Sequence, residues 1–451
     1  MNFKIENKIS NSLGRAGVLA TSHGNILTPA FVAVGTKATV KSLTPEQVAA
    51  ANSQIVLANT YHLYLEPGEK IIKEAGGLHQ FMNWSGPIMT DSGGFQAFSL
   101  GVAYGNKLSK FIGSDIPDEE IMKILRPATA EAKTGEERKA KITEDGVEFR
   151  SIIDGSKHFF TPEKSMQIQN DLGADIIFAF DECTSPHASK EYLREAMERT
   201  HRWAERCLTE FRQLKEGKEL SLEQPEYFSA EKSPHSPASR GPRVVLETIP
   251  FPSPAPRRGV RGEVFEQHLF GIVQGGRYED LRKASANVIG KTDFGGFGIG
   301  GSFVKEDMAN AVRWVNEILP AEKPRHLLGV GEPIDLILGV ENGCDTFDCV
   351  APTRLARNGT LYIKYGKINI MNAKYKNIFE PIEVDCGCYT CQNYTTAYIS
   401  HLFRSKEMLA ATLASIHNIY FLNNLMSQIR ESILNNTFFD FKEKFLSKYK
   451  V

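Results

Sequence analysis

The chain has 451 residues, a formal net charge of -1, 41% hydrophobic residues and 24% charged residues. These values are typical of a globular protein with one large domain and additions, or with two to three domains. They exclude a polycation, so any nucleic-acid site has to be a local basic patch. The start lacks a signal peptide and no apolar run is long enough to cross a bilayer, so we expect a cytoplasmic protein without a membrane partner.

Short apolar runs that end in polar or glycine-rich turns predict eight strands. In chain order they are Phe31–Val34, Ile55–Ala58, Ile88–Thr90, Asp175–Phe180, Leu269–Val273, Phe297–Ile299, His326–Leu328 and Thr346–Val350. Helical patterns separate several of them, for example Pro162–Leu172, Lys190–Lys215 and Lys305–Ile318. This order favours an α/β fold of the (β/α)8 TIM-barrel type. A doubly wound open sheet is the alternative.

Four polar residues follow or end these runs, and their positions favour the barrel. Asp91 follows Ile88–Thr90, Asp181 follows Phe180, Gln274 follows Val273, and Asp348 lies in the last run. Barrel enzymes place their sites at the carboxyl ends of the strands, because the loops at that face converge on one mouth.

Two segments interrupt the strand and helix pattern. Residues 105–140 contain a charged helical piece, and residues 216–264 contain eight prolines, which predict an irregular surface excursion. We therefore expect a catalytic barrel domain over residues 1–376 with these two insertions. Residues 377–451 should form a metal-binding subdomain followed by C-terminal helices.

Three closely spaced cysteines predict a metal site. Cys386, Cys388 and Cys391 follow a C-x-C-x-x-C pattern, whereas the other four cysteines are dispersed and do not suggest a disulfide framework. Three thiolates and one imidazole satisfy a tetrahedral zinc ion, and a closed set of four protein ligands makes the zinc structural. His417, in a good helix, is the first candidate for the fourth ligand, and His401 is the second.

The turn Thr90-Asp-Ser-Gly-Gly-Phe-Gln96 can bring backbone N–H groups close to a ligand, with an aromatic ring beside them. A plain turn with Asp91 as a helix cap is the alternative. Asp181 in FDECT can accept two donors from the edge of a heterocycle, or can act as a cap. Gln274 in GIVQGG can read a base edge or belong to a turn. The glycine-rich Gly296–Gly301 segment lies too late in the chain for a dinucleotide site and indicates backbone close to a ligand.

A basic stretch follows Asp348. Residues 352–376 contain six basic residues and no acidic one, with three tyrosines between them. Such a stretch suits a phosphate backbone with unstacked bases, although a solvated charged face is the usual alternative. Its position next to an acid at the barrel mouth favours RNA.

The motifs TDSGGFQAFSL, AFDECT, GIVQGG, GIGG, GVGEP, FDCVAPTRLARNG and C-x-C-x2-C…H occur here in one order. In this the chain resembles the tRNA-guanine transglycosylases (queuine tRNA-ribosyltransferases) of the bacterial, queuosine-pathway type, from about Phe31 to the C-terminal helices. The resemblance implies exchange of the wobble guanine of tRNA for a free 7-deazaguanine base, the prequeuosine base or queuine. It also implies a homodimer and one structural Zn²⁺ per chain.

The resemblance assigns roles to individual residues. Asp348 matches the nucleophile that forms a covalent ribosyl-aspartate, and Asp91 matches the general acid and base. The expected base-binding residues are Ser92, Gly93, Gly94, Phe95, Asp181, Gln274, Gly300, Gly301, Ser302 and Leu328. The expected RNA-binding residues are Gly329, Val330, Gly331, Thr353, Arg354 and Arg357. Cys386, Cys388, Cys391 and His417 match the zinc ligands, which decides against His401.

The loop after Gly301 departs from the family. Bacterial members usually read GGLAVGE there, whereas this chain has Ser302, Phe303 and Lys305 before the retained Glu306. A lysine that pointed inward would repel the cationic prequeuosine base, so we expect an altered base preference, with queuine as the candidate. An archaeal-type or DNA-modifying relative and a non-enzymatic accessory subunit are the alternatives. The compact metal subdomain argues against the first, and the presence of both acids argues against the second.

Overall fold

The computed structural model describes residues 2–99, 140–185, 188–222, 266–300 and 305–450. Within these residues, eight strands close into a barrel in which every neighbouring pair is parallel. In barrel order they are β4 (Ala30–Val34), β5 (Val56–Ala58), β6 (Ile88–Thr90), β10 (Ile176–Phe178), β11 (His268–Val273), β12 (Gly296–Ile299), β13 (Arg325–Leu327) and β14 (Thr346–Cys349). The predicted TIM barrel is confirmed, and the open sheet is excluded.

The barrel strands are buried on both faces, which explains why they appear in the sequence as apolar runs. In β4, Phe31 and Ala33 pack in the outer core under the helices, whereas Val32 and Val34 belong to the cluster inside the barrel. Successive side chains of a strand point to opposite faces, and here both faces are covered. All eight strands end within two residues of their predicted bounds.

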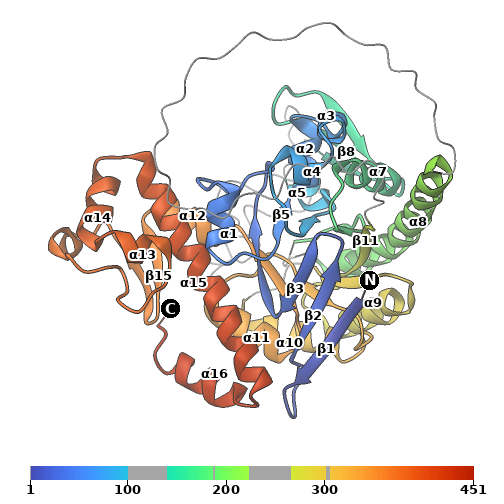
Figure 1. Cartoon of the computed structure of the whole chain (residues 1–451). Helices are drawn as coiled ribbons and strands as arrows, with labels where there is room; N and C mark the ends of the chain where they lie inside the picture. Colours follow the sequence, from blue (N-terminus) through green and yellow to red (C-terminus); the bar gives the residue numbers. More distant parts are fainter. Residues whose placement is uncertain (1, 100–139, 186–187, 223–265, 301–304, 451) are drawn as a thin grey trace, which may run out of the picture.

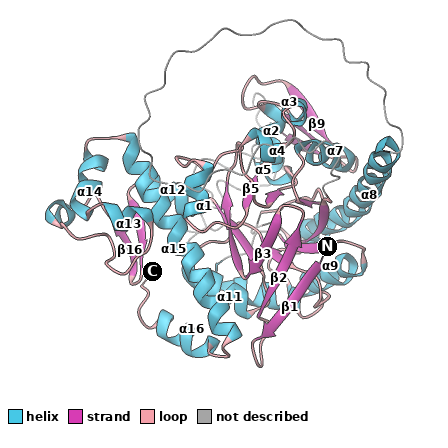
Figure 2. Cartoon of the chain, in the orientation of Figure 1, coloured by secondary structure: helices cyan, strands magenta, loops and turns pink. Residues whose placement is uncertain are grey.

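Helices surround the barrel (Figure 2). Those before the C-terminal region are α1 (Pro45–Ala50), α2 (Thr60–Leu65), α3 (Glu69–Glu74), α4 (Leu78–Phe81), α5 (Gly94–Ser99), α7 (Pro162–Leu172), α8 (Lys190–Leu222), α9 (Glu279–Lys291), α10 (Met308–Asn316), α11 (Pro333–Glu341) and α12 (Ala351–Arg357). Helix α7 has its predicted bounds because local signals mark both ends. Thr161 caps the first turn, Pro162 opens the helix, and Gly173 ends it in the left-handed conformation.

The two predicted insertions are covered only in part. Residues 105–139 and 223–264 lie outside the described residues, while residues 140–142 belong to strand β7. Helix α8 continues to Leu222, past the predicted end at Lys215. The prediction of irregular structure from residue 216 onward is therefore wrong for residues 216–222, because the first proline of that segment is Pro225.

Three antiparallel units were not predicted. The first is a sheet of β1 (Asn2–Lys8), β2 (Arg15–Thr21) and β3 (Gly24–Thr28), and the second is a sheet of β7 (Ala140–Ile142), β8 (Val147–Arg150) and β9 (Lys157–Phe160). The third is the hairpin of β15 (Thr360–Ile363) and β16 (Gly366–Asn369). The sheet β1–β2–β3 covers one end of the barrel (Figure 1). Its Leu19 and Ile26 join the cluster inside the barrel, and His23 contacts Asp175 just before β10. It therefore closes the amino-terminal end of the barrel and leaves the carboxyl end for ligands.

The C-terminal region consists of α13 (Tyr389–Asn393), α14 (Thr396–Arg404), α15 (Met408–Leu434) and α16 (Phe438–Leu446). Figure 1 shows α14–α16 on the side of the barrel opposite α7 and α8. The long helix α15 contacts β4 and α12, and the Asn423 side chain donates to the carbonyl of Ala51. The division at residues 376/377 stays a prediction. No helix in the described ranges is long and apolar enough to span a membrane.

One half-buried histidine predicts loss of stability in acid. His201 of α8 lies 3.0 Å from the Ser285 hydroxyl of α9, and burial lowers its pKa from 6.5 to about 4. Between these values the unfolded chain binds a proton that the folded chain excludes. This contribution to stability is complete above pH 6.5 and is lost as the pH falls toward 4. Urea unfolding at pH 7 and pH 5 should show a smaller pH effect in His201→Gln than in the wild type; equal pH effects would contradict the assignment.

Candidate active site

A cavity of about 610 Å³ opens at the carboxyl ends of the barrel strands. The predicted residues that line it are Asp91, Ser92, Gly93, Phe95, Asp181, Gly300, Leu328, Gly329, Val330, Gly331, Asp348 and Arg354. Gly94, Gln274, Thr353 and Arg357 are placed nearby but do not line it. Gly301, Ser302 and Phe303 lie outside the described residues, as does the side chain of Lys305, so the structure leaves the unusual loop undescribed.

Two donors converge on one oxygen of Asp348, at the end of β14. The Gly329 amide donates to Oδ1 over 2.8 Å, and Nε2 of His326 lies 3.1 Å from the same oxygen. The Asp348 side chain is 13% exposed, so it reaches the cavity while most of its surface is covered. Burial raises the pKa of the neighbouring Cys349 thiol to about 12. That sulfur stays protonated and is a weak nucleophile beside the carboxylate.

Asp91 is held by the turn that follows β6. Oδ1 accepts from the Thr60 amide at 2.9 Å and from the Gly93 amide at 3.2 Å, while the Asn59 amide group donates to Oδ2. Gly93 adopts φ +77°, and a Cβ there would lie 3.2 Å from the Tyr61 nitrogen. Glycine at this position therefore lets the chain turn back and point an amide at Asp91.

Asp181 forms the centre of a buried polar cluster. Ser92 Oγ donates to Oδ1 at 3.0 Å, and Gln274 Nε2 donates to Oδ2 at 2.5 Å. The Oε1 atom of Gln274 is buried and has no hydrogen-bond partner among the described residues. Gln274 thus holds Asp181 from behind and does not line the cavity itself. Such a set of fixed acceptors can bind the N–H groups of a heterocycle edge.

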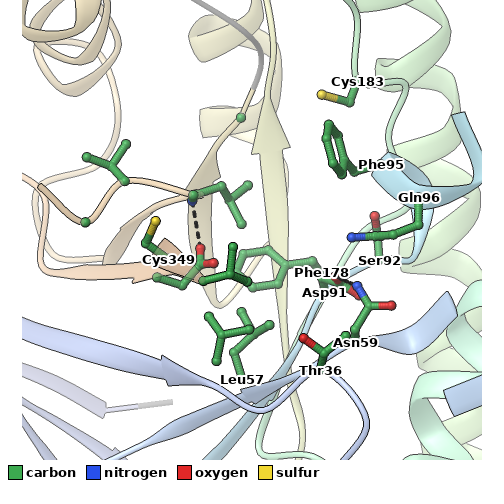
Figure 3. Close-up of a pocket in the computed structure, with 18 of the residues that line it drawn as sticks. Thr36, Leu57, Asn59, Asp91, Ser92, Phe95, Gln96, Phe178, Cys183 and Cys349 are labelled. Atoms are coloured by element: carbon green, nitrogen blue, oxygen red, sulfur yellow. Dashed lines mark hydrogen bonds between the residues drawn. The ribbon is translucent and has the colours of Figure 1, made fainter. Parts of the chain in front are cut away.

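Aromatic and sulfur groups form one wall of the cavity. Figure 3 shows the Phe95 ring and the Cys183 thiol close together, across the cavity from Cys349. Leu57, Phe178 and Ile272 contribute apolar surface from three barrel strands. A flat ring beside apolar groups suits the faces of a planar base, while the polar cluster suits its edge.

Several lining residues were missed from the sequence: Thr36, Lys41, Asn59, His62, Gln96, Glu332 and Asp335. Asn59 and His62 follow β5, so the rule applied to Asp91 and Asp181 would have found them. Burial, together with nearby Lys37 and Lys41, lowers the pKa of His62. This keeps the ring neutral near pH 7, so it can donate or accept in the cavity.

The two arginines of α12 differ in position. Arg354 is exposed at the edge of the cavity, whereas Arg357 is half-buried with its Nη1 atom lacking a hydrogen-bond partner among the described residues. Burial and the charge of Arg354 lower the pKa of Arg357. Two guanidinium groups one helical turn apart beside a cavity can bind phosphate groups.

The predicted metal ligands lie together beside the barrel. Cys386, Cys388, Cys391 and His417 place their ligand atoms within 4.8 Å of one another. Nδ1 of His417 lies 3.9, 3.5 and 3.4 Å from the three sulfurs in that order. A tetrahedral zinc ion holds sulfur and nitrogen ligands about 3.6 Å apart, so the spacing fits.

A second contact fixes the histidine of this cluster. Nε2 of His417 lies 2.7 Å from the Tyr362 carbonyl, so it carries the proton and leaves Nδ1 for a metal. His401 is exposed on α14 and is not part of the cluster. The four residues could therefore hold a metal ion, and their chemistry suits zinc.

Comparison with known proteins relates the whole chain to one family. The family model for queuine tRNA-ribosyltransferase matches residues 10–225 and 258–451. The queuine tRNA-ribosyltransferase of Thermoanaerobacter pseudethanolicus is 45% identical over 452 aligned residues, which cover 100% of this chain and 98% of that protein. The enzyme of Desulforamulus reducens is 43% identical, with 100% of this chain and 99% of that protein aligned. The enzyme of Lysinibacillus sphaericus is also 43% identical, with 96% of this chain and 92% of that protein aligned. The chain therefore belongs to the queuine tRNA-ribosyltransferase family of enzymes.

Proposed function

We propose that the chain is a tRNA-guanine transglycosylase that exchanges the wobble guanine of a tRNA anticodon for a free 7-deazaguanine base. The observation that carries the proposal is that Asp91, directly after β6, and Asp348, in β14, line one cavity. Membership in the queuine tRNA-ribosyltransferase family supports tRNA as the substrate.

Asp348 is the proposed nucleophile. Its carboxylate attacks C1′ of the ribose, the C1′–N9 bond breaks, and the electron pair leaves with guanine. The resulting ribosyl-aspartate keeps the RNA on the enzyme until the second base displaces the carboxylate. One difficult displacement is thereby divided into two easier ones, as in retaining glycosidases.

Asp91 is the proposed general acid and base. In its protonated form it gives a proton to the departing guanine, and the resulting carboxylate takes a proton from the incoming base. The amides of Thr60 and Gly93 and the side chain of Asn59 orient the carboxylate and stabilise its charged form. No net proton is gained or lost over the complete exchange.

Asp181 and its partners are proposed to recognise the base edge, with Phe95 stacking on the ring. Guanine and 7-deazaguanines present N1–H and an exocyclic amine, which a carboxylate can accept together. Leu328 and Gly300, which line the same cavity, complete the described part of the proposed base site, while Gly301 and Ser302 stay expectations from the resemblance. Gln274 acts by holding Asp181, which explains its position behind the cavity wall.

Asp181→Asn should weaken base recognition without preventing tRNA binding. Asparagine replaces one acceptor with a donor, which then faces a donor of the base. We expect kcat/KM for the free base to fall about 10- to 100-fold. The KM for tRNA, from the same kinetics, should stay within about twofold and serves as the control. An equal loss in both parameters would contradict a specific role in base recognition.

RNA binding is proposed for the rim of the cavity around α12. Arg354 and Arg357 would hold phosphates of the anticodon loop, with Thr353 at the same helix and Gly329–Gly331 along the cavity edge. Lys367 extends this surface, since its ammonium group lies 2.7 Å from Glu332, which lines the cavity. Backbone amides and arginines position a nucleic acid without reading its sequence.

Zinc is the proposed metal of the cysteine cluster, with a structural role. Four protein ligands close the coordination sphere and leave no position for a substrate.

Large apolar side chains are exposed in the C-terminal region: Phe379 at 74%, Val384 at 72%, Tyr389 at 51% and Met408 at 89%. We propose that a second copy of the chain covers them in a homodimer. A cytoplasmic location stays a prediction.

Incorporation of radiolabelled guanine into unmodified tRNA tests the proposed function. Wild-type protein should label the tRNA, and an unlabelled 7-deazaguanine should release the label again. Steady-state kinetics with the prequeuosine base and with queuine then test the preference inferred from Ser302, Phe303 and Lys305. A strong preference for the prequeuosine base would contradict that inference, whereas absence of any labelling would contradict the function itself.

A further inference from the structure

A buried histidine lies directly behind the proposed nucleophile. His326 of β13 is 0% exposed, with Nε2 3.1 Å from Asp348 Oδ1 and Nδ1 2.9 Å from Thr346 Oγ1. The barrel register explains this arrangement. His326 pairs with Thr346 of β14, and Asp348 lies two residues further along the same face of that strand. The ring is thus held between a hydroxyl and a carboxylate.

Packing leaves the ring little freedom. The Phe178 ring of β10 lies 5.4 Å from it, centre to centre. On the neighbouring strand β12 the residue paired with His326 is Gly298, where a Cβ would lie 2.8 Å from the Phe178 ring. Glycine at this position therefore leaves room for Phe178 to pack against His326.

The hydrogen-bond chemistry determines which nitrogen carries a proton. An ionised carboxylate only accepts, so Nε2 of His326 has to donate to Asp348 Oδ1. In the neutral ring Nδ1 is then an acceptor, and the Thr346 hydroxyl can donate to it. The direction of donation runs from Thr346 through His326 to Asp348, which fixes both the tautomer and the ring plane.

We infer that His326, oriented by Thr346, is a positioning residue for Asp348 in the proposed transglycosylation, on which this inference rests. The His326 ring and the Gly329 amide both bind Oδ1 and set the plane of the carboxylate. Oδ2 is then the oxygen that forms the bond to C1′ as the C1′–N9 bond breaks.

The same two donors also act in the second step. In the covalent intermediate Oδ1 is the carbonyl oxygen of the ester. When the incoming base displaces Asp348, negative charge returns to the carboxylate, and donors already in place stabilise it. No proton moves to or from His326 in either step, so its contribution is geometric and electrostatic.

Two substitutions of His326 separate positioning from packing. His326→Leu removes the donor but keeps an apolar group, whereas His326→Gln can place an amide N–H near the position of Nε2. We expect His326→Leu to lower kcat about 10- to 100-fold, with KM values for tRNA and base within about twofold. His326→Gln should recover most of the loss. Rates of formation and decay of the covalent adduct, resolved on denaturing gels, should both fall in His326→Leu.

Thr346→Val is the third variant, and it leaves the ring in place. It should lower kcat more mildly than His326→Leu, and it decides the question if His326→Leu does not fold. Wild-type kcat in Thr346→Val, or no recovery in a folded His326→Gln, overturns the inference. The wild-type exchange rate in the same assay tests the proposed function separately, because only an inactive wild type would contradict that function.

Discussion

Asp348→Asn should abolish base exchange while the protein stays folded. Asparagine has the shape of aspartate and keeps an oxygen that can accept from Gly329 and His326. Its amide is a very poor nucleophile, so the covalent intermediate cannot form. We expect guanine incorporation to fall by at least about 10³-fold and the enzyme–tRNA adduct on denaturing gels to disappear. The melting temperature should change little.

Asp345→Asn provides a matched control from the same segment of the chain. Asp345 immediately precedes β14, where it forms a buried ion pair with Arg15 and accepts from the Arg325 amide. Loss of one partner of a buried pair is strongly destabilising, by about 3–5 kcal/mol. This variant should melt at lower temperature yet still form the adduct while folded. An adduct in Asp348→Asn would exclude Asp348 as the nucleophile.

Loss of the metal cluster should have the largest effect on stability. Cys388→Ser removes a buried thiolate from a closed ligand set, and His417→Ala removes the residue that links the cluster to the Tyr362 carbonyl. Structural zinc in small peptides contributes about 10–16 kcal/mol, so we expect a loss of more than about 3 kcal/mol here. Elemental analysis should give one zinc per wild-type chain and less than one in either variant. Thermal melts should show the C-terminal region unfolding first.

Two controls match these substitutions in residue type. Cys344 is a buried thiol outside the cluster, and His401 is an exposed histidine on α14. Cys344→Ser and His401→Ala should both retain the full zinc content. Full metal content in His417→Ala, or a melting temperature unaffected by complete zinc removal, would contradict a structural zinc site.

Position along the chain was sufficient to predict which end of the barrel carries the acids. Asp91 and Asp181 follow apolar runs, and parallel strands bring their carboxyl ends to one face whatever their exact pairing. The residues behind that face were not predictable in this way. Gln274 and Asp181 lie 93 positions apart, and only the neighbouring positions of β10 and β11 bring their side chains within 2.5 Å.

Residue order alone thus predicted the eight strands and the three clustered cysteines, because apolar runs and short cysteine spacings are local signals. The choice of His417 over His401 came from the family resemblance, and the fold brings His417 beside the three cysteines. The tertiary structure decided what local signals leave open. Asp345 and Asp348 are alike in sequence, but one end of β14 meets Arg15 and the other meets the cavity. The proposed role of His326 follows only from the register of β13 with β14. Strand register and barrel closure depend on contacts across the whole core, and no short stretch of sequence contains them.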